Sequence, residues 1–247
     1  ACNPWGRTLQ LMSTHPLVVT RIRALEESGL PGAPARWSVL RSMAQVPESE
    51  RRRARSRFAR ELLVAVAPWV VLVAVLVFGA FTGSVTSVGV ALAGAGILLF
   101  VKQQLRYPGA FTPVAEVTAL LERLDASPVA GLGVEVKGRI LGRGMPGYVL
   151  SPDLVVQDGS GFVPLLYRQP LPLVASLFAL FRAERYLGQE VVARGWYRRA
   201  PGPVVELREV VAGDGTRSRS WLWAARYAGS VLLVVVGLVV AVVGLSI

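Results

Sequence analysis

The sequence predicts a membrane protein with a soluble β-rich domain, in which three transmembrane helices accompany a five-stranded barrel that carries one helix. Three observations lead to this class. The 247 residues are 53% hydrophobic and only 17% charged, with a mean hydropathy of +0.48. Three apolar runs contain no charge and are long enough to cross a bilayer. Between the second and third runs, the hydrophobic pattern changes to one typical of strands.

Residues 1–30 are predicted to be a loop that leads into a helix. Ser13-Thr14-His15-Pro16 precedes Leu17 to Leu25, and Pro16 suits a first helical position. The chain opens on Ala1 without a methionine or a signal-peptide pattern, so we expect further sequence upstream. Cys2 is the only cysteine, which excludes an intrachain disulfide.

Residues 31–60 are predicted to be a linker and a basic, amphipathic approach to the membrane. The segment 31–34 breaks regular structure with two prolines and a glycine, and six arginines lie between Arg51 and Arg60. A helical stripe is expected between these two segments, formed by Trp37, Leu40, Met43 and Ala44. Residues 1–60 hold 11 basic and 4 acidic side chains of a chain whose net charge is +11. This placement indicates contact with an anionic leaflet, and it argues against nucleic acid as the partner.

Residues 61–102 are predicted to form a transmembrane helical hairpin. The first span is Leu62 to Phe81, with a kink at Pro68, and the second is Val85 to Val101. The third span is predicted within residues 213–247, from Ala228 to Ile247, after an aromatic entrance at Trp221, Trp223 and Tyr227. No span contains an ionisable residue, which argues against a transporter or pump. Small residues four apart, such as Gly89 with Ala93 and Gly237 with Ala241, suit close helix packing without specifying a dimer.

Basic residues beside the spans predict the orientation. They precede the first span, follow the second at Lys102 and Arg106, and precede the third at Arg217, Arg219 and Arg226. All of them lie inside if the N-terminus is inside. We therefore expect a multi-pass protein of the cell membrane, with a cytoplasmic N-terminus, a cytoplasmic middle domain and an external C-terminus.

The middle of the chain is predicted to contain a connecting helix within residues 103–130 and a barrel over residues 131–212. The helix is expected over Val114 to Leu124. Strands are expected from Gly133 through Ile140, at 154–157 and 162–167, and at 190–197 and 204–211, with a hairpin turn at 158–161 and one helix over 171–187. This order of three strands, one helix and two strands resembles the OB-fold.

Two patterns in this domain resemble binding sites, for oligonucleotides and for dinucleotides, but each is better explained by structure. OB-folds often bind oligonucleotides, but the domain has a mild charge and strand aromatics more often fill a core. The side chains that could serve such binding are Phe162, Tyr167, Arg168, Arg194, Trp196, Tyr197, Arg198 and Arg199. The segment 142–147 matches G-x-G-x-x-G, yet Pro146 interrupts it and no helix is expected after it, so a loop is the better interpretation.

The motif Ser-Thr-His-Pro at 13–16, with Arg21-Ile22 and Leu25 downstream, resembles the end of the catalytic domain in HtpX-type membrane zinc metallopeptidases. The resemblance implies a zinc ion held by an H-E-x-x-H helix and a later glutamate, none of which is in this sequence. With one histidine, this chain by itself is not expected to bind zinc or to be active. In such a family His15 would lie near the active-site cleft and Arg21 would help to hold the cleft together.

The resemblance implies that the chain is the C-terminal portion of a metalloendopeptidase acting on membrane or misfolded proteins, and that residues 1–30 are the remnant of its catalytic domain. His15 and Arg21 each have a structural alternative. His15 could lie at the start of a helix with its hydrogen bonds made to the backbone, and Arg21 could lie on a solvent-exposed helix face. The alternative function is a non-enzymatic, membrane-anchored OB-like module that docks a partner protein.

Overall fold

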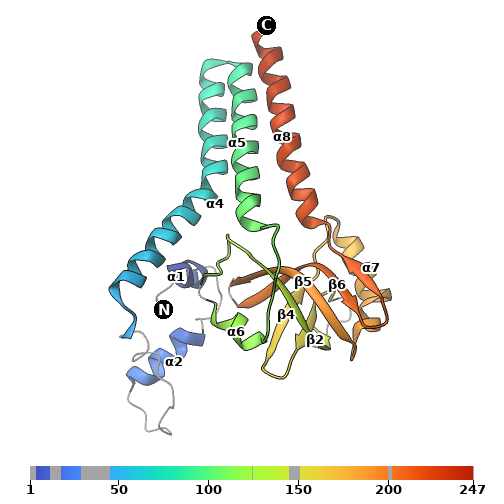
Figure 1. The fold of residues 1–247 in the computed structure, drawn as a ribbon. Coiled ribbons are helices and arrows are strands. Elements are labelled where there is room, and N and C mark those ends of the chain that lie inside the picture. Colours follow the sequence, from blue (N-terminus) through green and yellow to red (C-terminus); the bar gives the residue numbers. More distant parts are fainter. Residues whose placement is uncertain are drawn as a thin grey trace. The chain divides into compact units, whose positions relative to one another are not determined.

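The computed structural model describes residues 4–11, 18–28, 45–123, 125–144, 151–199 and 202–246 (Figure 1). The chain divides into two compact units, Ala1–Leu63 and Val64–Ile247. The stripe expected at Trp37 to Ala44 lies outside the described residues, as does His15.

The first unit contains α1 (Pro4–Leu11), α2 (Val18–Glu27) and the beginning of α4 (Glu48–Thr82). The indole Nε1 of Trp5 on α1 donates a 2.7 Å hydrogen bond to Oε2 of Glu61, and its ring meets Phe58 edge-on at 4.9 Å between centroids. These contacts hold α1 against α4. The basic stretch 51–60 is part of α4, and the helix continues from it without interruption into the first apolar span.

Three helices are long and apolar enough to cross a membrane: α4, α5 (Val85–Arg106) and α8 (Leu222–Leu245). α4 continues through Pro68. The α4–α5 turn places Gly83 at φ +64°, and Ser84 caps α5 by accepting a hydrogen bond from the amide of Ser87. The membrane class predicted from the apolar runs is confirmed at this level.

α5 and α8 approach each other through small residues. A Cβ built on Gly237 would lie 2.3 Å from the amide nitrogen of Ala93, and one on Gly89 would lie 2.2 Å from that of Ala241. Only glycine fits at such distances, so these small residues bring the two helix backbones together within one chain.

The middle domain is a closed, five-stranded mixed barrel. Its strands are β2 (Leu132–Arg143), β3 (Leu154–Gln157), β4 (Phe162–Leu166), β5 (Glu190–Arg199) and β6 (Pro203–Ala212). They pair in the order β2-β3-β4-β6-β5, and β5 returns to β2; the β4–β6 pair is parallel. Residues such as Ile140, Val156, Leu165 and Leu207 fill the interior. With α7 (Pro172–Phe181) between β4 and β5, the fold is the barrel with one helix predicted from the element order.

The structure differs from the predicted elements in four details. α6 spans only Val117–Glu122, because the chain before it follows β2: Thr112–Pro113 forms β1, and the Val114 amide donates a 2.9 Å hydrogen bond to the Glu135 carbonyl. The helix expected over 171–187 is interrupted at Arg182, where a 3₁₀ turn, Ala183–Tyr186, follows and brings Ala183 and Tyr186 into the core. α8 begins at Leu222 and not at Ala228. β7 (Arg217–Arg219) was not expected, because it has no apolar residue.

Candidate functional site

The two site residues predicted from sequence are not brought together among the described residues. His15 lies outside them, and Arg21 is exposed on α2. α2 does follow the Ser-Thr-His-Pro segment as expected, and Thr20 at its start donates a 3.1 Å hydrogen bond to Gln10 on α1. The roles given to His15 and Arg21 stay predictions.

No group of three or more His, Cys, Asp or Glu side chains that could hold a metal ion occurs in the described part of the chain. The single histidine also cannot provide the two that an H-E-x-x-H site needs. These residues by themselves therefore do not fit a catalytic zinc ion of the H-E-x-x-H type.

The side chains considered for oligonucleotide stacking are mostly buried. Tyr197 lies in the barrel core, and Tyr167 stacks on Phe178 there at 3.9 Å between ring centroids. Trp196 is buried against Tyr107, and its Nε1 donates a 3.0 Å hydrogen bond to the carbonyl of Pro108. Side chains in these positions hold the fold together and cannot form an open stacking surface.

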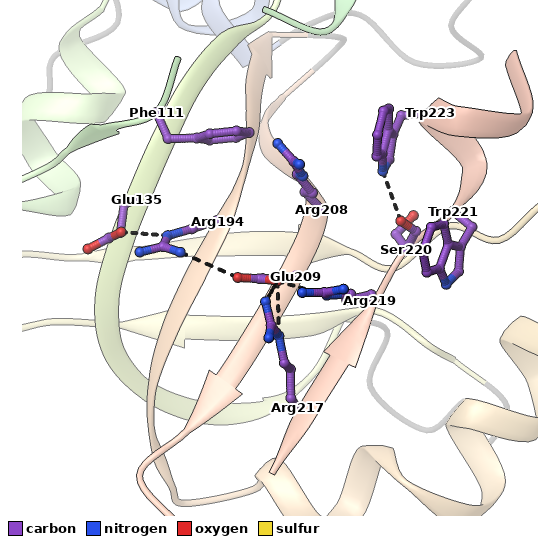
Figure 2. Close-up of a pocket in the computed structure, with 10 residues that line it drawn as sticks. All are labelled: Phe111, Glu135, Arg194, Arg208, Glu209, Arg217, Arg219, Ser220, Trp221 and Trp223. Atoms are coloured by element: carbon purple, nitrogen blue, oxygen red, sulfur yellow. Dashed lines mark hydrogen bonds and ion pairs between the residues drawn. The ribbon is translucent and has the colours of Figure 1, made fainter. Parts of the chain in front are cut away.

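An arginine-lined pocket of about 540 Å³ lies on the outer face of the barrel where α8 begins (Figure 2). Its charged floor is a row across four neighbouring strands. Glu135 on β2 is opposite Arg194 on β5, which is opposite Glu209 on β6, which is opposite Arg219 on β7. Opposite charges in directly facing positions favour this register.

Glu209 is the centre of that row. Its carboxylate accepts hydrogen bonds from Arg219 Nε at 3.1 Å, from Arg194 Nη1 at 3.5 Å and from two guanidinium nitrogens of Arg217. Burial alone would raise the pKa of Glu209, but the hydrogen bonds and charges of Arg217 and Arg219 lower it below the ordinary value. Glu209 is therefore held as a carboxylate that fixes three arginines around the pocket.

Arg208 reaches the same pocket because of a β-bulge. The register of β5 with β6 shifts between Arg194 and Gly195, which pair with Glu209 and Leu207, so that Arg208 is the extra residue. A bulge changes which face a side chain points to, and Arg208 and Glu209 both lie outside although they are adjacent in sequence. Leu207 and Val210 on either side face the core.

The guanidinium of Arg208 is held by aromatic rings. Its central carbon lies 5.3 Å from the ring centroid of Phe111 and 5.0 Å from that of Trp223. Such cation–π contacts orient an arginine without neutralising it. Among the described residues, no carboxylate pairs with Arg208, so the pocket holds four arginines against two glutamates.

A second charged cluster joins the barrel to the ends of two membrane helices. Glu206 on β6 accepts a 2.8 Å hydrogen bond from the Tyr107 hydroxyl, and Arg106 and Arg198 each place a nitrogen 3.3 Å from its Oε2. Arg226 on α8 lies 3.7 Å from its Oε1. Burial alone would raise the pKa of Glu206. The positive charges of Arg198 and Arg106 outweigh this effect, so the pKa lies below its ordinary value. Burial also lowers the pKa of Arg198, to about 10.

From the sequence, Arg194 was considered for oligonucleotide binding, and four other lining residues were named only as neighbours of the third span: Arg217, Arg219, Trp221 and Trp223. That these side chains line one pocket was not predicted. One signal was available: in residues 203–212 the alternation of polar and apolar side chains breaks at the adjacent Arg208 and Glu209, which is typical of a bulge. The lining of the pocket combines guanidinium groups that are held in place with indole rings. The Ser220 hydroxyl also lines the pocket, but it already donates a hydrogen bond to the carbonyl of Arg168. Such a set of arginines suits the binding of a carboxylate or a phosphate.

Comparison with known proteins finds no family model and no curated protein that matches this chain.

Proposed function

We propose that this chain is the membrane-anchored C-terminal portion of an HtpX-type zinc metalloendopeptidase that cleaves membrane or misfolded proteins. The observation that carries the proposal is the Ser-Thr-His-Pro segment at 13–16 with Arg21, Ile22 and Leu25. The position of α2, which begins at Val18, two residues after Pro16, and carries those three residues, supports it. The zinc ligands would come from sequence outside these 247 residues, because the chain has one histidine.

The test uses the longer protein in which this chain occurs. An H-E-x-x-H segment upstream of Ala1, bound zinc and cleavage of casein are expected. The variant His15→Ala should lose cleavage while keeping its zinc, because the proposed role of His15 is at the cleft and not as a ligand. Ser28→Ala, an exposed change at the end of α2, is the matched control. An unrelated upstream sequence would overturn the proposal, and full activity of His15→Ala would overturn the role of that residue.

We propose further that the protein is multi-pass in the cell membrane, with the N-terminus and barrel in the cytoplasm and the C-terminus outside. Basic residues beside the spans support this orientation. In a Cys2→Ser background, single cysteines at positions 83 and 247 should react with an impermeant maleimide in intact cells, and one at the exposed Gly159 should not. Labelling at position 159 with protection of positions 83 and 247 would show that the orientation is the opposite one.

A second candidate function is a non-enzymatic, membrane-anchored module that docks a partner protein. The pocket favours it, because Arg208 presents a positive charge that is oriented by Phe111 and Trp223 and has no carboxylate partner among the described residues. An acidic peptide should quench the tryptophan fluorescence of the intact chain. Arg208→Ala should weaken this effect at least tenfold, whereas Lys137→Ala, an exposed change on β2, should not. Equal quenching in both variants would exclude the pocket as the docking site.

A further inference from the structure

Helix α7 exposes large apolar side chains on the face that points away from the barrel. Leu173, Val174, Leu177, Leu180 and Phe181 are each 42 to 69% exposed. They recur at intervals of three and four residues, which places them in one stripe along the helix. Ser176 is the only polar residue among the ten of α7.

The opposite face of α7 packs on the barrel core. Phe178 and Ala179 are buried, and the Phe178 ring lies against Tyr167 and Tyr186 of the barrel core. Packing on the barrel therefore explains one side of the helix and leaves the outer stripe without a partner in the described structure. A surface helix in water normally carries polar residues in such positions.

Hydrogen bonds tie the segment before α7 to the segment before α8. The Gln169 side chain donates to the Arg219 carbonyl at 2.7 Å and accepts from the Trp221 amide at 3.3 Å. The Tyr167 hydroxyl donates to the same carbonyl at 3.0 Å, and the Ser220 hydroxyl donates to the carbonyl of Arg168. Figure 1 shows α7 at the end of the barrel from which α8 rises.

This attachment places the start of α7 beside the start of α8. α8 has 24 residues and is ~36 Å long at ~1.5 Å per residue, which exceeds a hydrocarbon core of roughly 30 Å. Its first turn, next to the exposed Trp221, therefore reaches the headgroup region. Exposed arginines flank α7 at positions 168, 182 and 185, where they can meet lipid phosphates.

We propose that α7 is an interfacial membrane helix, which lies along the bilayer surface with Leu173, Leu177 and Leu180 among the lipid chains. The barrel would then be fixed to the membrane by α7 as well as by the transmembrane helices. This inference goes beyond the proposed function, since it concerns how the barrel contacts lipid and needs neither zinc nor peptidase activity.

The test places the full chain in vesicles of phosphatidylcholine and phosphatidylglycerol. In a Cys2→Ser background, an environment-sensitive fluorophore is attached to Leu177→Cys on the outer face of α7 or to Glu184→Cys in the following turn. The label at 177 should be quenched by lipids with brominated acyl chains and shielded from aqueous iodide, and the label at 184 should show the reverse. Iodide quenching at 177 equal to that at 184 would overturn the proposal. Shielding of 177 from both quenchers would also overturn it, in favour of a protein that covers α7.

A charged variant provides the second arm. Leu177→Glu with Leu180→Glu should abolish brominated-lipid quenching of a label at position 173. The same substitutions should leave the thermal unfolding of the detergent-solubilised chain unchanged, because both side chains are exposed in the fold. Glu184→Gln should keep the quenching at 173. Quenching that persists in the double variant would show that the apolar stripe does not insert into the bilayer.

Discussion

Glu206 is the residue on which the junction between barrel and membrane helices depends. Its side chain is 7% exposed and lies among Arg106, Arg198 and Arg226, which carry three positive charges against its one negative charge. Arg198 is itself buried, and its Nη1 has no hydrogen-bond partner among the described residues. Removal of the Glu206 carboxylate would leave the buried positive charge of Arg198 without its ion-pair partner.

We expect Glu206→Gln to lower the free energy of unfolding by about 3–5 kcal/mol, the usual result of breaking a buried ion pair from one side. Glu209→Gln is the matched control. It also removes a carboxylate from three arginines, but those side chains are 47 to 48% exposed, and the cost should be about 1 kcal/mol or less. Chemical denaturation of the detergent-solubilised chain measures both. Equal losses would contradict the distinction between the two clusters.

Asp158 gives the stability a defined dependence on pH. Its Oδ2 accepts a 2.7 Å hydrogen bond from the Val117 amide at the start of α6, and its Oδ1 accepts from the amides of Ser160 and Gly161. Burial opposes the charge, but these bonds and the Ser160 hydroxyl lower the pKa from 3.8 to about 2. Because the folded pKa is below the unfolded one, the stabilisation is complete above pH 3.8 and is lost as the pH falls towards about 2.

Asp158→Asn should therefore cost about 1 kcal/mol of unfolding free energy at neutral pH, as expected for the loss of a helix-capping carboxylate. The difference between wild type and variant should shrink as the pH falls from 3.8 to about 2. Denaturation curves across this range measure it. A difference that remained constant would show that the negative charge of Asp158 is not the stabilising feature.

At the scale of elements, sequence patterns predicted those structures whose signal is local. Uninterrupted apolar length identified α4, α5 and α8, and β3 has the predicted bounds because turn residues enclose it. The end of α7 at Arg182 could not be predicted, since the break depends on Tyr186 reaching Ser218 with a 2.8 Å hydrogen bond between distant segments. β7 has no local signal, because its arginines are positioned by Glu209 of β6. The pocket has one local signal, the adjacent Arg208 and Glu209, but its other lining residues come from separate segments that only the folded barrel brings together.

The α5–α8 contact predicts opposite effects for two glycines of one helix. Gly237→Ala would place a Cβ 2.3 Å from the Ala93 nitrogen, and separation of the helices should cost about 1–3 kcal/mol. A Cβ on Gly229 meets nothing within 4 Å, so Gly229→Ala should be neutral or slightly stabilising. Thermal unfolding in detergent compares them. A similar change in melting temperature for both variants would contradict the close packing at Gly237.

At the scale of the whole unit Val64–Ile247, one aromatic cluster links the barrel to the membrane helices. Trp196 of β5 contacts Tyr107 at the end of α5, with ring centroids 4.6 Å apart, and Trp223 of α8 at 6.2 Å. Trp196 is buried, but it points outward from the barrel and is not part of the barrel's interior core. The barrel should therefore be able to keep its fold when this link is removed.

We expect Trp196→Ala to release the barrel from the helix ends without unfolding it. Truncation of a buried tryptophan costs about 3–5 kcal/mol, and here the loss falls on the junction because the interior core is untouched. The connection at Pro108 would also lose its 3.0 Å hydrogen bond from the indole, so chymotrypsin should cleave near Tyr107 and Phe111 and leave a resistant barrel fragment. Trp221→Ala, at a tryptophan that is 54% exposed, is the control and should resist cleavage at this connection. Rapid degradation of the whole barrel in Trp196→Ala would show that Trp196 stabilises the barrel itself and not its attachment to the membrane helices.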